Sequence, residues 1–299
     1  MCGITGLFLK RPELRNELGL WSARMLHEMR DRGPDSAGFV VYGEPVAGAK
    51  LTLLSETGTV DWGELFASLK SALGVEMSYQ TIEDHAVFEF EKDVAADARE
   101  WILANAPDVI VSSAGKSMEV FKGVGDPAEV GKRFGLESRT GTHAITHTRM
   151  ATESAVIIRG SHPFSTGRDT CLVHNGSLSN HNQLRRFLQL QGESFQTEND
   201  SEVAAGYLSW RMGQGDNLDA ALEHAIEDLD GFYTFAIGSL DGFAVVRDPI
   251  ACKPAVIAET DDWVAMASEF RAIAVLPDAR NANIWEPEPS RVYSWHQTQ

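Results

Sequence analysis

The chain has 299 residues, of which 43% are hydrophobic, and carries a formal net charge of −17 at pH 7. This length allows one large core or two modest ones, and the hydrophobic share is ordinary for a globular protein. The acidic balance argues against nucleic acid or an anionic membrane as the main partner. It indicates either simple solubility or docking onto a basic partner protein.

No apolar run approaches the ~20 residues that a membrane span requires. The apolar start of the chain has no basic residue before it and no cleavage site after it, so it is not expected to be a signal peptide. Three widely spaced cysteines form neither a disulfide framework nor a metal-ligand pattern. A reducing cytoplasm is therefore the expected location.

The predicted elements of residues 1–45 begin with a short buried strand near the N-terminus. Helical spacing of Leu18, Trp21, Met25 and Met29 predicts a helix over residues 18–29. The turn sequence Arg32-Gly33-Pro34-Asp35 follows, and then a strand over residues 38–42.

Residues 55–140 are predicted to form a small α+β module inserted into the main domain. Helices are expected over residues 62–73 and 94–105, with strands over 75–79, 85–90 and 108–112. Residues 61–105 hold ten carboxylates against three basic residues, which indicates a solvated acidic face. The stretch Ala114-Gly115-Lys116-Ser117 superficially resembles a phosphate-binding loop, but the upstream glycine of that motif is missing.

Residues 141–299 are dense in predicted strands bounded by Gly, Asp or Pro. The expected strands cover residues 173–176, 231–238, 243–248, 255–258 and 263–268. Helices are predicted over residues 182–190, 200–212 and 218–229.

Cys2 is the first candidate for chemistry. Removal of Met1, which the small side chain of cysteine permits, would leave a thiol and a free α-amino group on one residue. An α-amino group has a pKa of about 7.7–8.0, so it can accept the thiol proton near neutral pH and generate a nucleophilic thiolate. A cysteine at position 2 is weak evidence by itself, since most such residues are incidental.

Three further clusters carry polar groups at strand or helix ends. Arg149 follows an alternating strand, and its planar fork suits a bidentate grip on a carboxylate, although such an arginine is most often a surface ion pair. Asn175-Gly176 ends another strand and forms either a turn or two donors for an oxyanion. Asp200 opens a helix as part of an N-terminal cap.

The order of these clusters resembles that of the class II (N-terminal cysteine) glutamine amidotransferases. The matching stretches cover nearly the whole chain apart from the acidic insertion: Cys2-Gly3-Ile4, residues 32–38, 147–152, 162–164, His174-Asn175-Gly176, residues 199–202, 231–236 and 247–254. The resemblance implies an α+β fold, a four-layer αββα sandwich of the N-terminal nucleophile hydrolase type.

The resemblance also implies a role for each matching residue. Cys2 is the expected nucleophile, with its α-amine as base, and Asn175 and Gly176 are the expected oxyanion hole. Arg149 is expected to hold the glutamine α-carboxylate, and Asp200 to pair with its α-ammonium. The full set of expected substrate-binding residues is Arg149, Thr152, Asp200, Arg32, Gly33 and His174.

No synthase domain is recognisable in the chain, so the released ammonia is expected to pass to a separate subunit. The insertion is similar to that of amidotransferase subunits of glutamate synthase or N-methylglutamate synthase, which implies a partner carrying FMN and iron–sulfur clusters and no cofactor in this chain. His143, His147, His162 and His174 are interpreted as structural rather than as a metal site.

Two other functions stay open at this point. One is a non-catalytic subunit that binds glutamine or glutamate for assembly, which retention of Met1 would favour because an acylated α-nitrogen cannot act as a base. The other is an N-terminal nucleophile hydrolase that acts on another amide. Arg149 and Asp200 together argue against it, since the pair specifies an α-amino acid.

Overall fold

The main body of the computed structural model is built on a seven-stranded antiparallel sheet. The structure describes residues 2–150 and 156–297. The strands lie in the order β14–β12–β13–β1–β8–β2–β7, with β1 and β8 at the centre. Their bounds are β1 Gly3–Leu9, β2 Ser36–Tyr42, β7 Met118–Val124, β8 His143–Arg149, β12 Val256–Glu259, β13 Trp263–Ala267 and β14 Asn283–Trp285.

A second antiparallel sheet of four strands packs against the first. Its order is β15–β11–β10–β9, with β9 Cys171–Leu178, β10 Gly231–Ser239, β11 Gly242–Arg247 and β15 Val292–His296. The core between the sheets contains Ile4 and Val40 from one sheet and Val173 and Phe243 from the other. Gly6 makes room for this packing, because an added Cβ would lie 2.5 Å from the Phe243 ring.

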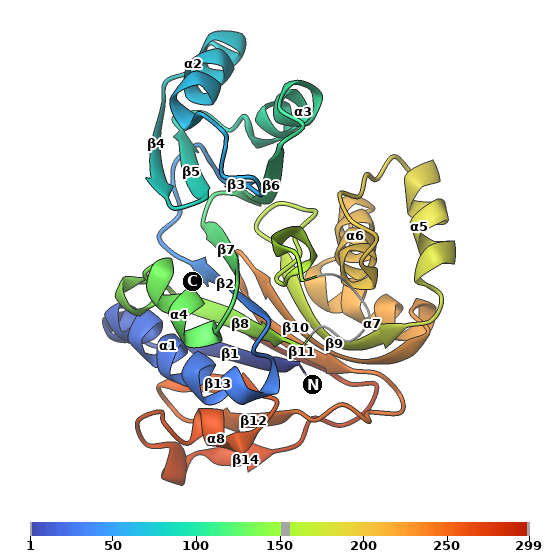
Figure 1. Cartoon of the computed structure of the whole chain (residues 1–299). Helices are drawn as coiled ribbons and strands as arrows, with labels where there is room; N and C mark the ends of the chain where they lie inside the picture. Colours follow the sequence, from blue (N-terminus) through green and yellow to red (C-terminus); the bar gives the residue numbers. More distant parts are fainter. Residues whose placement is uncertain (1, 151–155, 298–299) are drawn as a thin grey trace.

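Helices cover the outer face of each sheet. On the seven-stranded sheet the buried residues of α1 Leu18–Glu28, α4 Pro127–Arg133 and α8 Phe270–Ile273 form one core. On the four-stranded sheet the covering helices are α5 His181–Leu190, α6 Asp200–Gly213 and α7 Leu218–Asp228. The layers therefore run helix, sheet, sheet, helix, as Figure 1 shows.

A third sheet, which we call the accessory sheet, stands apart from this body. Its strands lie in the order β4–β5–β3–β6, with two helices over one face and a core of its own. The bounds are β3 Ala49–Ser55, α2 Trp62–Leu73, β4 Met77–Ile82, β5 His85–Phe90, α3 Ala95–Asn105 and β6 Val109–Gly115. It forms the upper part of Figure 1.

The accessory sheet begins and ends earlier than the predicted module of residues 55–140. Strand β3 starts at Ala49, whereas β7 pairs with β2 in the main sheet and α4 packs on that sheet's helical face. The boundary prediction was wrong at both ends because β3, β7 and the short helix α4 were not recognised. The acidic helices α2 and α3 do belong to the separate unit.

One carboxylate fastens the joint between the accessory sheet and the main body. Asp169 accepts hydrogen bonds from the backbone N–H groups of Lys116, Ser117 and Met118 at 2.7–3.2 Å. An added Cβ at Gly115 would lie 2.2 Å from the Asp169 carboxyl carbon. Successive backbone N–H groups are a general way to bind an anion. In this chain the anion is its own Asp169, so these N–H groups already have a partner within the protein.

Candidate active site

Cys2 lies directly before β1, at the end of the central strand of the large sheet. Its backbone carbonyl accepts two hydrogen bonds, from Arg32 Nε at 3.0 Å and from Asn175 Nδ2 at 3.3 Å. The next residues are held as well, since Ile4 N donates to Ser268 Oγ at 3.0 Å. Residue 2 is therefore held by Arg32, from the turn before β2, and by Asn175 of β9. It is half-buried, with its thiol outside any disulfide.

Arg32, which the sequence predicts to bind substrate, pairs in the structure with the Cys2 backbone and with an acidic side chain. Besides binding the Cys2 carbonyl, it donates from Nη1 to Glu269 Oε1 at 2.5 Å, and its side chain is only 9% exposed. The hydrogen bond from Arg32 and the positive charge of Arg271 hold the pKa of Glu269 below its ordinary value. The sequence analysis missed Glu269, because nothing local marks a partner 237 positions away from Arg32.

Arg149 ends β8 and is mostly buried, with 8% of its surface exposed. Gly33 packs against its backbone so closely that an added Cβ would lie 2.5 Å from the Arg149 N and C atoms. Only glycine fits there, so the turn at residues 32–35 can lie on the end of β8. Thr152, the predicted helper of Arg149, lies outside the described residues.

A pocket of about 460 Å³ opens beside Arg149. Its other walls come from two loops, residues 157–160 and 195–199. The second loop is held by buried Glu202, whose carboxylate accepts from Gln196 N and Thr197 N, both at 2.7 Å. The pocket can therefore present a guanidinium and ordered backbone groups to a small polar ligand.

Asn175 and Gly176 lie on β9, an edge strand of the four-stranded sheet that packs against the large sheet. Asn175 is 5% exposed and its amide faces residue 2, as the hydrogen bond to the Cys2 carbonyl shows. Gly176 is exposed with φ at +152°, and an added Cβ would lie 1.9 Å from the Phe232 carbonyl oxygen. The site therefore requires glycine at position 176.

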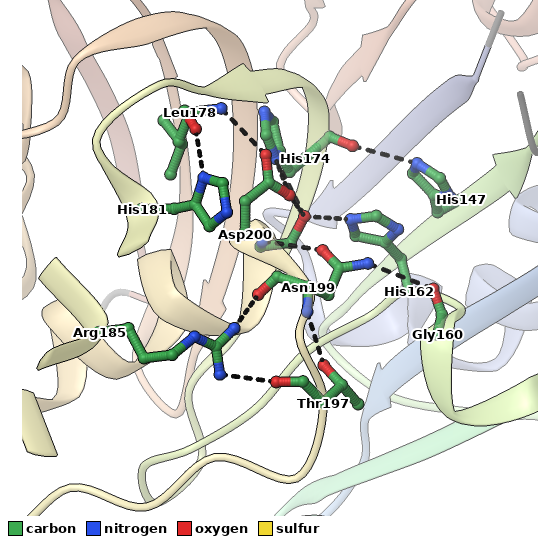
Figure 2. Close-up of polar contacts among 11 residues, drawn as sticks. His147, Gly160, His162, His174, Leu178, His181, Arg185, Thr197, Asn199 and Asp200 are labelled. Atoms are coloured by element: carbon green, nitrogen blue, oxygen red, sulfur yellow. Dashed lines mark hydrogen bonds and ion pairs between the residues drawn. The ribbon is translucent and has the colours of Figure 1, made fainter. Parts of the chain in front are cut away.

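Asp200 is the first residue of α6, after the cap residue Asn199, whose Oδ1 accepts from Ser201 N at 2.9 Å. Asp200 Oδ2 accepts from Leu178 N at 2.9 Å, and Oδ1 lies 3.7 Å from His174 Nδ1. Burial raises the pKa of Asp200, but His174, the Leu178 N–H and His181 outweigh it and lower the pKa to about 2. The carboxylate is therefore charged at neutral pH; Figure 2 shows its contacts with Leu178 and His174.

Three buried histidines link the helix start to the strands. Ser201 Oγ lies 2.9 Å from both His162 Nε2 and His174 Nδ1. His147 Nε2 lies 3.2 Å from the His174 carbonyl oxygen, and Figure 2 shows how these three histidines are arranged. Burial lowers the pKa of His147 to about 3 and that of His162 well below its ordinary value. These two rings are neutral, and His174 Nδ1 lies beside both Ser201 and Asp200.

The described part of the chain contains no group of three or more His, Cys, Asp or Glu side chains arranged to hold a metal ion. Within the same residues, no helix is long and apolar enough to cross a membrane.

The structure therefore brings Cys2, Arg32 and Asn175 into direct contact, and separately joins His174, Asp200 and Ser201. Arg149 borders the pocket with Asn199, which precedes Asp200. Together these residues offer a thiol, an amide donor for an oxyanion, and charged groups of both signs that could bind an amino acid.

Comparison with known proteins agrees with this arrangement. Residues 147–275 match the glutamine amidotransferase domain family. The chain belongs to the class II glutamine amidotransferases.

Relatives that match along the full length support this assignment. The chain is 53% identical over 296 residues, 99% of its length and 98% of the relative's, to the glutamine amidotransferase-like protein GlxB of Rhizobium meliloti (strain 1021). A protein of Methanothermobacter thermautotrophicus that is provisionally named a glutamine amidotransferase is 32% identical, over 98% of this chain and 99% of its own.

Among solved structures, the glutamine phosphoribosylpyrophosphate amidotransferase from B. subtilis aligns with a TM-score of 0.61 and 21% identity. The alignment covers 99% of this chain and 49% of that one. At this identity the likeness shows a shared fold, and this chain spans about half the length of the B. subtilis chain.

Proposed function

We propose that this protein is a glutaminase subunit that hydrolyses L-glutamine to glutamate and ammonia through a thioester on Cys2. The observation that carries the proposal is the pair of hydrogen bonds to the Cys2 carbonyl, from Arg32 and Asn175. Between them, Arg32 from the turn before β2 and Asn175 from β9 hold position 2 beside an amide donor. The helix–sheet–sheet–helix order supports assigning the fold to the N-terminal nucleophile hydrolase type.

Recognition of glutamine follows from two opposite charges. Arg149 would hold the α-carboxylate, since its guanidinium borders the pocket, and Asp200 would pair with the α-ammonium, since its pKa keeps it ionised. Thr152 would assist Arg149, while Gly33 allows the close approach that places it. His174 contributes by orienting Asp200.

The chemistry requires Met1 to be removed, so that Cys2 has a free α-amine. The amine takes the thiol proton, and the thiolate attacks the carboxamide carbon to give a tetrahedral oxyanion. Asn175 Nδ2 and the Gly176 N–H stabilise that oxygen. The α-ammonium returns the proton to the leaving nitrogen, ammonia departs, and water then hydrolyses the γ-glutamyl thioester to glutamate and the free thiol.

We further propose that the ammonia passes to a separate synthase subunit of the glutamate synthase or N-methylglutamate synthase type. That subunit would carry FMN and iron–sulfur clusters, whereas this chain would need no cofactor. The full-length similarity to an amidotransferase-like protein supports the amidotransferase part of this proposal.

The test is release of glutamate from glutamine by the purified protein, alone and with its synthase partner. Wild-type protein should release glutamate, the Cys2→Ala variant should not, and a Cys252→Ala variant, which removes an exposed cysteine elsewhere, should match wild type. Absence of glutamate release by wild type even in the reconstituted complex would overturn the proposal.

A further inference from the structure

The accessory sheet is not an isolated appendage, because it contacts the walls of the pocket beside Arg149. The contact begins at Glu56, the residue that follows β3. Its carboxylate oxygen Oε1 accepts from the Arg159 backbone N at 3.2 Å, and Oε2 accepts from Arg159 Nε at 2.6 Å. Arg159 Nη2 also contacts Oε2. One carboxylate thus holds both the main chain and the side chain of Arg159.

The turn that Glu56 holds lies against the proposed carboxylate-binding group. The turn is Ile158–Gly160, and both Arg159 and Gly160 line the pocket. Gly160 lies so close to Arg149 that an added Cβ would be 3.4 Å from Arg149 Nη1. The Gly160 carbonyl also accepts from Asn199 Nδ2 at 3.5 Å (Figure 2). A shift of this turn would therefore change the position of the Arg149 guanidinium.

The opposite pocket wall touches the accessory sheet as well. Gln196 Nε2 donates to the carbonyl oxygen of Val111, a residue of β6, at 3.4 Å. This contact is longer than the bonds made by Glu56. Both loops that form the pocket walls thus contact the accessory sheet, one through Glu56 directly after β3 and the other through Val111 of β6.

We infer that Glu56 is a positioning residue for glutamine: through Arg159 and the turn at residues 158–160, it holds Arg149 in place for the substrate carboxylate. This inference rests on the proposed function and deepens it. It gives the accessory sheet a role in substrate affinity at the same pocket.

The Glu56→Gln variant tests the inference, because a purely electrostatic role and a positioning role for Glu56 predict opposite changes in glutamine affinity. If Glu56 acted only as a charge, its removal would make the pocket more positive and would tighten carboxylate binding. If it positions the turn, glutamine binding should weaken by about tenfold, the size of one lost charge-assisted hydrogen bond. The KM for glutamine should rise by this factor, with kcat within about twofold of wild type, because the nucleophile is untouched.

The matched control is Asp93→Asn. Asp93 makes an ion pair with Arg168 at 2.8 Å, which also joins the accessory sheet to the main body but lies away from the pocket. If the substitutions act by loosening the accessory sheet in general, the KM for glutamine should rise in both Glu56→Gln and Asp93→Asn. If Glu56 positions the turn, the KM of Asp93→Asn should stay at the wild-type value.

Binding measured on the inactive Cys2→Ala protein separates this inference from the proposed function. Titration calorimetry with glutamine should show binding by Cys2→Ala, about tenfold weaker binding when Glu56→Gln is added, and unchanged binding when Asp93→Asn is added. If Cys2→Ala binds glutamine and the two added substitutions behave alike, or Glu56→Gln tightens binding, the inference is wrong and the proposed function stands. If Cys2→Ala binds no glutamine, glutamine recognition itself fails and the inference fails with it.

Discussion

Arg32 connects Glu269 to the backbone of Cys2. Its Nε donates to the Cys2 carbonyl at 3.0 Å, while its Nη1 donates to Glu269 Oε1 at 2.5 Å. Because the side chain is largely buried, it has little freedom to leave this position. We interpret the pair as a support that sets the orientation of the nucleophile rather than the affinity for substrate.

Replacing Glu269 by Gln should therefore lower kcat and leave the KM for glutamine nearly unchanged. We expect a loss in kcat of about tenfold, equivalent to about 1.4 kcal/mol of transition-state stabilisation. Steady-state glutamate release measures both constants. Glu259→Gln is the matched control, since Glu259 pairs with Lys10 just beyond the opposite end of β1. An equal loss in both variants, or a change in KM alone, would contradict the positioning role.

Replacing Asp200 by Asn should weaken glutamine binding through its α-ammonium. The Asn side chain retains an oxygen for the Leu178 N–H, but it loses the charge, and we expect a loss of about 2 kcal/mol, or about thirtyfold in Kd. Calorimetry on the Cys2→Ala background gives this value. The analogue 4-carbamoylbutanoate, which lacks the α-amino group, should bind both proteins alike. A similar loss for both ligands would show that Asp200 does not contact the ammonium.

The buried histidines should make the protein sensitive to acid. Burial lowers the pKa of His143 to about 3, so between the ordinary histidine pKa of about 6.5 and pH 3 the unfolded chain binds a proton that the folded chain does not. The free energy of unfolding is therefore fully retained above pH 6.5 and falls as the pH falls, by up to about 1.4 kcal/mol per pH unit for each such histidine.

His143→Phe tests this dependence away from the catalytic groups, since His143 begins β8 and Arg149 ends it. The aromatic ring can keep its stack on Tyr42, where the ring centroids are 4.0 Å apart. Urea unfolding at pH 7 and pH 5 should show a smaller acid loss in the variant, by about 2 kcal/mol. Parallel pH dependence in the two proteins would show that His143 does not stay neutral in the folded state.

The Asp169 joint should contribute to the stability of the accessory sheet. Its carboxylate accepts from three consecutive backbone N–H groups, and an amide at this position would present its own donors to some of them. Asp169→Asn should cost about 2–3 kcal/mol and speed hydrogen exchange at residues 116–118. Asp126→Asn is the control, because Asn caps a helix about as well as Asp. Equal hydrogen-exchange rates at residues 116–118 in the two variants would show that Asp169 does not hold these backbone N–H groups.

Much of the fold could be predicted from local pattern. The predicted helix over residues 62–73 coincides with α2, whose start is capped by Asp61 and whose end is a left-handed Gly74. The strand over residues 85–90 coincides with β5. Alternating or helical spacing and clear terminators lie within these segments themselves, so no knowledge of distant contacts was needed.

The missed elements lacked such local signals. Strand β7 is a mostly buried edge strand next to β2, and its sequence shows neither clear alternation nor a long apolar run. It belongs to the main sheet only because of its pairing with β2, in which Ser36 lies opposite Val124. Short strands of this kind are assigned by tertiary pairing, which local propensity does not contain.

The candidate site shows the same division. The residues of the main clusters could be named from the sequence because their order along the chain resembles that of the class II glutamine amidotransferases. Glu269 and Glu56 could not, since each acts on an arginine more than 100 positions away, across different elements. The direct contact between Asn175 and Cys2 likewise arises only when the two sheets pack.

The central claim is that Cys2 becomes the N-terminal nucleophile of a glutaminase. Intact-mass measurement of the native protein, before and after reaction with a glutamine-analogue electrophile, tests it most directly. We predict a mass lacking Met1, one adduct located on Cys2, and no adduct on exposed Cys252 or in Cys2→Ala. Retention of Met1 together with an unreactive Cys2 would contradict the claim and would favour a subunit that binds glutamine or glutamate without hydrolysing it.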